Sequence, residues 1–189
     1  MNAPLLPYAG TLAAVAAEHP LLGLALLHHR TTRNKPLSFR DRPYLVEPYR
    51  DLPRLDGMDG VKAVQTGWTD MLVQLAFERS GWQGRSVVYV LPKGRARDDF
   101  VQTRVDPLLL SVPAYRARLP GAGESDPGSV GEVPEEGAAA NLRIKRFGPG
   151  SMRFLGSNVP DEFVEFSADV LIVDEHDHCD ESNLNLARD

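Results

Sequence analysis

The sequence has little cysteine, no excess of positive charge and no long uninterrupted apolar segment. Its single cysteine, Cys179, excludes an internal disulfide and fits a reducing compartment. The net charge is −5 and the isoelectric point is near 5.5. A protein that grips nucleic acid over its whole surface is usually basic, so any contact of this chain with DNA is expected to be local.

The most apolar stretch, residues 12–27, contains Glu18, His19 and Pro20, and no basic region precedes it. It is too short and too interrupted to span a bilayer or to serve as a signal peptide. We expect it to form two short helical pieces that meet near Pro20 and pack against the rest of the protein. We also find no internal repeat. The chain has 189 residues, of which 42% are hydrophobic, and this suffices for one domain with a hydrophobic core.

Strand and helix patterns alternate along the chain. Ser86–Leu91 and Asp169–Val173 are apolar at consecutive positions, as in strands that are buried on both faces. Apolar residues recur with helical spacing over Thr69–Arg79. A second helix is predicted over Arg95–Leu110, and Pro107 is expected to bend or end it. This alternation predicts the α/β class, with a largely parallel sheet flanked by helices.

The remaining segments predict less regular structure. Residues 1–35 are predicted to be a helical lead-in, and residues 36–57 an extended arm with a short helix. Residues 120–140 are rich in Gly, Pro, Ser and Glu, which predicts a flexible surface loop. Leu142–Phe147 and Ser151–Leu155 flank a Gly-Pro-Gly turn and predict a β-hairpin.

The segment KAVQTGWT, Lys62 to Thr69, lies between a short apolar run and a predicted helix. A phosphate-binding loop belongs there, because backbone N–H groups and the helix N-terminus face the anion. The standard motif has lysine directly before the hydroxyl residue, but here Trp68 takes that position. Lys62, at the first position, can fold back toward the phosphates, and Gly67 keeps the close backbone approach. Taken alone, this pattern also fits an ordinary strand, turn and helix.

Two acidic residues, Asp174 and Glu175, follow the apolar run that ends at Val173. An aspartate at a strand end can hold Mg²⁺, and the adjacent glutamate can polarise an attacking water. Two such acids can also be solvated loop residues. The two motifs lie about 105 residues apart, with a predicted strand between them. This is the order found in P-loop ATPases of the helicase-like and packaging-motor types.

The chain resembles the ATPase domain of phage terminase large subunits, in the lambda-like branch that has a deviant Walker A motif. That branch has a lysine at the start of the loop, Gln or Arg within it and an aromatic residue before Ser or Thr. The matching residues here are Lys62, Gln65, Gly67, Trp68 and Thr69. The resemblance extends over roughly residues 36–180.

Three other segments are similar to the family. The stretch from Leu37 to Asp51 resembles its adenine-side segment, in which Tyr44 and Tyr49 are candidates to approach the base. For both tyrosines a plain packing role is equally open. The segment 91–108 is similar to the stretch after the second strand of the family. Gly156-Ser157-Asn158 followed by Asp174 to Asp177 is similar to its GxN…DExD run.

The resemblance implies a P-loop NTPase, specifically a Mg²⁺-dependent ATPase that powers the packaging of viral DNA. Glu175 would be catalytic, and Thr69 and Asp174 would hold Mg²⁺ through the nucleotide. The implied ATP-binding residues are Lys62, Gln65, Thr66, Gly67, Trp68, Thr69, Tyr44 and Tyr49. The implied partners are viral double-stranded DNA, the small terminase subunit, the portal protein of the prohead and further copies of the subunit. The place of action would be the cytoplasm of the bacterial host, without a membrane.

The sequence also departs from the family. Family members continue into a coupling motif and a C-terminal nuclease domain, and neither is found here. We therefore expect residues 36–189 to form a partial, truncated ATPase domain without nuclease activity. Two other hypotheses stay open. One is a non-catalytic module that binds nucleotide or a partner protein, favoured by Trp68. The other is a helicase-like ATPase, although no helicase motif beyond the two Walker elements is present.

Two further patterns attract attention but predict little. The run from His176 to Asp180 contains histidine, cysteine and aspartate, but its spacing fits no standard zinc pattern. Arg95, Arg97 and Arg104 are candidates for an arginine finger, which stabilises charge in phosphoryl transfer. All three are interpreted more readily as surface residues.

Overall fold

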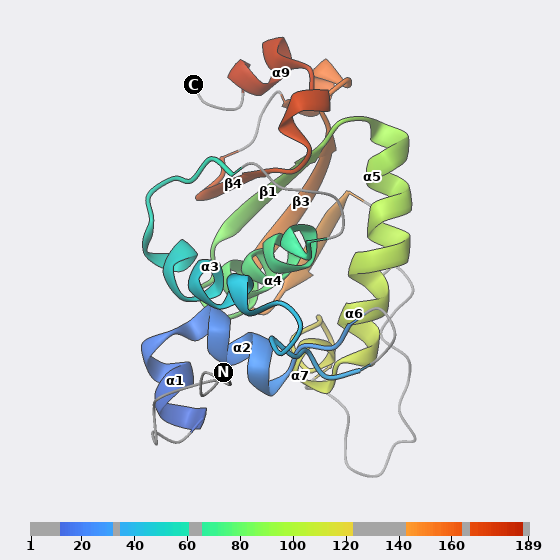
Figure 1. Cartoon of the computed structure of the whole chain (residues 1–189). Helices are drawn as coiled ribbons and strands as arrows, with labels where there is room; N and C mark the ends of the chain where they lie inside the picture. Colours follow the sequence, from blue (N-terminus) through green and yellow to red (C-terminus); the bar gives the residue numbers. More distant parts are fainter. Residues whose placement is uncertain (1–11, 32–34, 61–65, 123–142, 164–166, 187–189) are drawn as a thin grey trace. The chain divides into compact units, whose positions relative to one another are not determined.

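The computed structural model describes residues 12–31, 35–60, 66–122, 143–163 and 167–186 (Figure 1). The chain divides into two compact units, Met1–Glu78 and Arg79–Asp189, called here the first and the second unit. Each is described by itself. The apolar run predicted at residues 61–64 lies outside the described residues, as does nearly all of the loop predicted at 120–140.

The first unit begins with two short helices, α1 (Leu12–Glu18) and α2 (Pro20–Leu27). Pro20 occupies the first turn of α2, where its missing N–H costs nothing because that group has no intrahelical partner. The prediction of two helical pieces that meet near Pro20 is therefore confirmed.

Three short helical elements follow in the first unit, where an arm with a short helix was predicted. They are η1 (Pro43–Leu45), α3 (Val46–Asp51) and η2 (Leu52–Arg54). The longer helix α4 (Trp68–Gly81) begins in this unit and ends in the second. The buried Gln74 side chain of α4 donates a hydrogen bond to the hydroxyl of Tyr49 on α3 (2.6 Å). This bond joins α4 to α3 within the first unit.

The second unit contains the sheet. Among the described residues its strands are β1 (Ser86–Leu91), β2 (Ile144–Phe147), β3 (Gly150–Gly156) and β4 (Val170–Val173). Their order is β2-β3-β1-β4, with β1 parallel to both β3 and β4 and with β2 antiparallel to β3. The mixed α/β class and the predicted hairpin are thus confirmed, and the sheet is parallel in its centre.

Both faces of the central strands are buried. On one face Val88, Val90 and Leu155 pack with Phe163 and Leu184, which lie on η4 (Pro160–Phe163) and α9 (Glu181–Leu186). On the other face the rings of Tyr89 and Phe154 pack against Phe100 of α5 (Gly94–Phe100). Burial on both sides explains why β1 is apolar at consecutive positions instead of alternating.

The helical run after α5 changes its geometry before a proline. Residues Val101–Val105 form a π-helical segment, and α6 (Asp106–Ser111) and α7 (Pro113–Arg116) follow. The N–H of Asp106 donates to the carbonyl of Val101, five residues earlier. Pro107 lies in the first turn of α6 and has no N–H to donate. A wider turn removes the clash that a proline makes with the preceding turn of an α-helix, so the helical run continues past Pro107.

A buried ion pair joins the edge strand to α6. The ammonium of Lys145 on β2 lies 2.8 Å from a carboxylate oxygen of Asp106, and the lysine side chain is 1% exposed. Asp106 also stands in the first turn of α6, where a negative charge is favourable. In the part of the chain that the structure describes, no helix is both long and apolar enough to cross a bilayer.

Candidate functional site

Asp174 follows β4 directly, at the carboxyl ends of the parallel strands, and its side chain is buried. The Tyr89 hydroxyl donates to carboxylate oxygen Oδ2 (3.0 Å), and the Glu175 N–H donates to Oδ1 (3.1 Å). The backbone N–H of Asp174 bonds to the carbonyl of Val90 on β1 (3.1 Å). The predicted metal-ligating aspartate is therefore held by both its backbone and its side chain.

Glu175 has a very different environment. Its side chain is exposed and its backbone is left-handed, with φ 56° and ψ 45°. Among the described residues it is the one residue other than glycine with positive φ. This conformation costs about 1–2 kcal/mol for an L-residue, and such strain concentrates at functional sites. The left-handed turn ends β4 and starts η5 (His176–His178).

Ser157 connects the ends of β1 and β3 to the segment after η5. Its hydroxyl is fully buried, donates to the Pro92 carbonyl (2.7 Å) and accepts from the Asp180 N–H (2.9 Å). The carbonyl of Ser157 accepts from the side-chain amide of Asn183 on α9 (2.7 Å). The strand ends that flank Asp174 are therefore fixed by a buried polar network.

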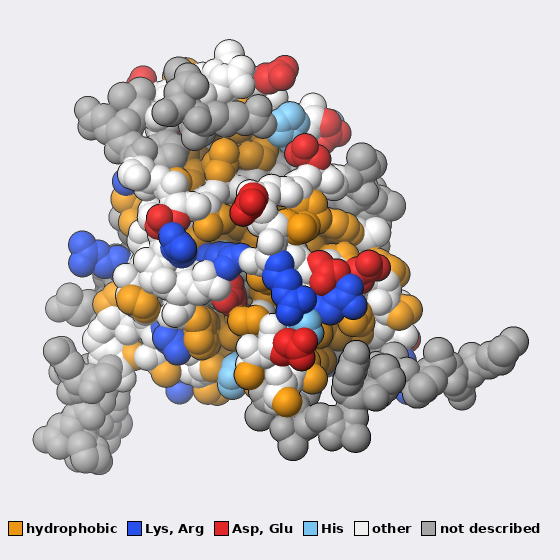
Figure 2. Space-filling view, turned by 90° about the vertical axis from the view of Figure 1, so that its left-hand side faces the viewer, with side chains coloured by type: hydrophobic (Ala, Val, Ile, Leu, Met, Phe, Trp, Pro, Cys, Tyr) orange, Lys and Arg blue, Asp and Glu red, His pale blue; other side chains and the backbone are white. Residues whose placement is uncertain are grey.

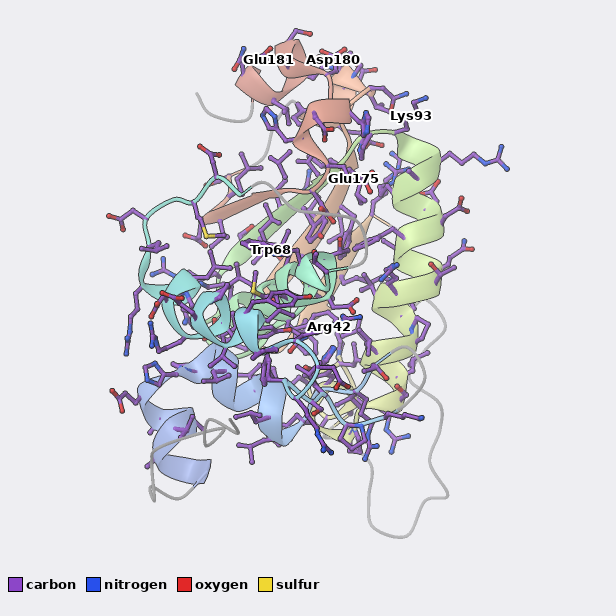
Figure 3. The ribbon with its side chains drawn as sticks, viewed as in Figure 1. Arg42, Trp68, Lys93, Glu175, Asp180 and Glu181 are labelled. Carbon is purple, nitrogen blue, oxygen red and sulfur yellow. The ribbon has the colours of Figure 1, made fainter. Side chains whose placement is uncertain are left out.

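Close packing and a hydrogen bond explain the glycine and the asparagine of the segment Gly156-Ser157-Asn158. A Cβ on Gly156 would lie 2.3 Å from the nitrogen of Gly94, so only glycine fits where the end of β3 meets the start of α5. The side chain of Asn158 accepts from that same Gly94 N–H (2.9 Å). Figure 3 shows Lys93, at this β1–α5 junction, and Glu175 at the same end of the sheet.

Arg97 is buried and forms ion pairs with two acidic side chains of the same unit. Its side chain is 5% exposed, and its guanidinium bonds to Glu162 and, over 2.8 Å, to Asp98. Burial alone would lower the pKa of Arg97, but the bonds to Asp98 and Glu162 outweigh it and hold that pKa above its ordinary value. Glu162 also accepts from the Gly156 N–H (2.9 Å). Arg97 therefore supports the strand ends, whereas the other two arginine-finger candidates, Arg95 and Arg104, are exposed.

In the first unit the described part of the predicted phosphate loop begins at Thr66. Gly67 has φ 92°, and a Cβ there would lie 2.7 Å from a guanidinium nitrogen of Arg42. The positive φ favours glycine here, whereas the Arg42 side chain could move to make room for a Cβ. Trp68 starts α4, and its ring lies against Gly60. Figure 3 labels Arg42 and Trp68 in this unit.

The two tyrosines that resemble the adenine-side segment are placed differently. Tyr44 is 53% exposed, and its hydroxyl donates to the carbonyl of Thr66 in the loop (3.1 Å). Tyr49 is 1% exposed and packs edge-to-face on Phe39, with ring centroids 5.1 Å apart. Tyr44 therefore lies beside the loop, and Tyr49 is a core residue of the first unit. A contact of either ring with adenine stays a prediction.

The structure places the other predicted site residues in part. Thr66, Gly67, Trp68 and Thr69 are half-buried around the start of α4 in the first unit. Lys62 and Gln65 lie outside the described residues. Asp174 and Glu175 are adjacent in the second unit. The described part of the predicted phosphate loop thus belongs to the first unit, and the predicted acidic pair belongs to the second unit.

Sequence reasoning missed Tyr89. The only signal was a polar atom inside an otherwise aliphatic strand, SVVYVL. A buried tyrosine hydroxyl normally has a hydrogen-bond partner, but the pattern does not identify that partner.

The segment 176–180 gives no support for a zinc site. Among the described residues, no three side chains of the His, Cys, Asp and Glu types are grouped to hold a metal ion. Burial raises the pKa of the Cys179 thiol. Asp180 instead caps the next helix: its carboxylate accepts from the Ser182 hydroxyl and N–H, and these bonds lower its pKa.

The surface charge agrees with the modest net charge. On the face drawn in Figure 2, basic and acidic side chains are interspersed, and neither sign covers it. A local contact of this chain with DNA stays a prediction.

Comparison with known proteins identifies the family. Residues 33–187 match the family model described as phage terminase large subunit gpA, ATPase domain. No curated protein and no solved structure gives a significant match. The matched range includes the predicted phosphate loop, the sheet and the Asp174–Glu175 pair. The chain belongs to the ATPase-domain family of the phage terminase large subunit gpA.

Proposed function

We propose that this chain binds ATP together with Mg²⁺ and hydrolyses it as the ATPase of a viral DNA-packaging motor. Membership of the terminase family establishes an ATPase domain of phage DNA packaging. The observation that carries the finer proposal is the pair at the end of β4. A buried, doubly hydrogen-bonded Asp174 is followed by an exposed Glu175 on a strained backbone.

The available side chains suit Mg²⁺. This ion prefers oxygen ligands, and typically takes one or two protein ligands together with phosphates and water. Asp174 of the second unit offers a carboxylate, and Thr69 of the first unit offers a hydroxyl. When bound, Mg²⁺ would neutralise charge on the β- and γ-phosphates. Asp174 and Thr69 would hold it there.

The phosphate loop would grip the nucleotide. The loop leads into the N-terminus of α4, where the helix dipole favours an anion. Gly67 lets that backbone approach a phosphate closely. Lys62 would reach the β- and γ-phosphates, with Gln65, Thr66 and Trp68 completing the loop. Tyr44, fixed to the loop through the Thr66 carbonyl, would lie beside the base.

Glu175 would act on the attacking water. An exposed carboxylate next to the metal-ligating aspartate can orient a water and accept its proton as the γ-phosphate is attacked. Because Glu175 is exposed and Asp174 is buried, we assign the two acids different roles.

In the assembled motor this subunit would act with viral double-stranded DNA, the small terminase subunit, the portal protein and further copies of itself. The site of action would be the cytoplasm of the bacterial host. The family match supports these partners over those of a helicase.

The test is the binding and turnover of a fluorescent ATP analogue by the full chain. Lys62→Ala should weaken binding at least about tenfold, because a charge-assisted phosphate contact is lost. Glu175→Gln should leave binding unchanged and slow hydrolysis by about 10²–10⁴-fold, the contribution of a general base. Lys35→Ala and Glu181→Gln, at exposed residues of matching type, serve as controls. A folded chain that binds no nucleotide, or that binds it equally well without Lys62, would disprove the phosphate-site assignment. Binding with no turnover would favour the non-catalytic alternative.

A further inference from the structure

Tyr89 is a buried polar residue that the assigned roles do not use. It lies in the middle of β1, is 0% exposed, and places its hydroxyl on the carboxylate of Asp174. We infer that Tyr89 is a positioning residue for the metal site: its hydroxyl orients Asp174 and thereby sets the Mg²⁺ concentration at which the site fills. This inference rests on the proposed function, because it takes Asp174 as the Mg²⁺ ligand.

The strand register brings the two side chains together. Tyr89 is the partner of Ile172 in the parallel β1–β4 pair, so Asp174 lies two residues beyond that partner. Residues two apart in a strand direction face the same side of the sheet. The long tyrosine side chain can therefore reach along the strand direction to the carboxylate after the strand end. A shorter residue at position 89 would not reach it.

The tyrosine ring is held firmly. Its centroid lies 5.2 Å from that of Phe100 on α5 and 5.9 Å from that of Phe154 on β3. The packing occupies the face opposite the cluster around Val88 and Val90. A ring confined between neighbouring aromatics keeps its hydroxyl at one point, so the hydrogen bond has a fixed direction.

The two donors divide the carboxylate of Asp174 between them. Tyr89 bonds Oδ2 and the backbone of Glu175 bonds Oδ1. Donors on different oxygens fix the rotation of the carboxylate. A carboxylate has about four acceptor positions, so two hydrogen bonds do not by themselves prevent metal ligation. Outer groups that orient a metal ligand commonly change metal affinity by about 10–100-fold when they are removed.

The experiment compares Tyr89→Phe with Tyr115→Phe in the full chain. Tyr115 is another fully buried tyrosine of the second unit, away from the strand end, so its variant controls for the loss of a buried hydroxyl. Binding of the fluorescent ATP analogue is titrated with Mg²⁺, and Mn²⁺ binding is followed by electron paramagnetic resonance in the presence of ADP. We expect Tyr89→Phe to raise the half-saturating metal concentration by about tenfold or more, with nucleotide binding in the absence of metal unchanged. Tyr115→Phe should leave both unchanged.

A double-mutant cycle with Asp174→Asn tests whether Tyr89 acts through Asp174. In the Asp174→Asn background, Tyr89→Phe should change metal binding no further. Unchanged metal binding in Tyr89→Phe, or equal losses in the Tyr89 and Tyr115 variants, would overturn the inference while leaving the proposed function intact. A wild-type chain whose nucleotide binding ignores Mg²⁺ and Mn²⁺ would instead overturn the assignment of Asp174, and this inference with it.

Discussion

The two units bury polar groups by different means. In the second unit two buried cations meet acids, Lys145 with Asp106 and Arg97 with Glu162. In the first unit the buried polar side chains include the imidazole of His29, which burial keeps neutral, the amide of Gln74 and the carboxyl group of Glu78. The difference teaches that the two units should fail under different conditions. Removing one partner of a buried ion pair should destabilise the second unit, and protonating His29 should destabilise the first.

Each unit carries its own reporter for such tests. The sequence has two tryptophans: Trp68 is in the first unit and Trp82 in the second. Trp82 packs edge-to-face on Tyr115 and Phe147, with the guanidinium of Arg118 4.0 Å from its ring centroid. When one tryptophan is replaced by phenylalanine, the remaining tryptophan fluorescence reports on the other unit only.

The largest expected effect is that of Lys145→Ala. It leaves Asp106 partly buried without its cation, which typically costs about 3–5 kcal/mol of unfolding free energy. Denaturant unfolding followed by Trp82 fluorescence, in a Trp68→Phe background, measures this loss. Lys145→Met combined with Asp106→Leu should recover most of it, because an apolar pair of similar volume needs no partner. Equal losses in the single and double variants would show that the lysine contributes packing and not charge pairing.

The next effect is a loss of stability of the first unit at acidic pH. Burial lowers the pKa of His29 to about 4, from 6.5. Between these values the unfolded chain binds the proton and the folded chain does not, so stability is fully present above pH 6.5 and is lost as the pH falls toward 4. The loss should reach about 3 kcal/mol, at about 1.4 kcal/mol for each pH unit of the shift.

Trp68 fluorescence in a Trp82→Phe background follows this acid transition. His29→Gln should flatten the dependence on pH between 6.5 and 4, whereas His28→Gln, at the exposed neighbour, should not. A wild-type first unit equally stable across this range would refute the assignment.

The smallest expected effect is a gain in stability from the substitution Glu175→Gly. Glu175→Gly relieves the left-handed strain of a non-glycine residue but adds the backbone entropy of glycine, for a net stabilisation of about 0.5–1 kcal/mol. The same change should abolish hydrolysis. Thermal unfolding and an ATPase assay measure the two effects, and Asp177→Gly, within a helical turn, should lose stability instead. A destabilised Glu175→Gly variant would mean that the left-handed turn carries no cost.

Much of this molecule follows from short-range patterns. The apolar runs of β1 and β4, the turn of the β2–β3 hairpin and the spacing of α4 were all predictable, because each depends on neighbours in the sequence. The Asp-Glu pair at the end of β4 was predicted for the same reason.

What escaped prediction depends on distant residues. Tyr89 and Asp174 are 85 residues apart, and only the register of parallel strands joins them. Tyr44 and Tyr49 belong to one sequence segment, yet the fold exposes one and buries the other. No local pattern distinguishes these outcomes, because burial is decided by what packs from elsewhere in the chain.

The π-helical segment at Val101–Val105 also has a consequence for how relatives should be aligned. A π turn holds one residue more than an α turn, so it behaves as a one-residue insertion within a helix. A relative without proline at the position of Pro107 needs no wider turn. Deleting one residue there would leave a continuous α-helix with both flanking helices in phase with the core. Alignments of this family should therefore place a single-residue gap inside the helix at this point, and treat its presence or absence as a marker that divides lineages.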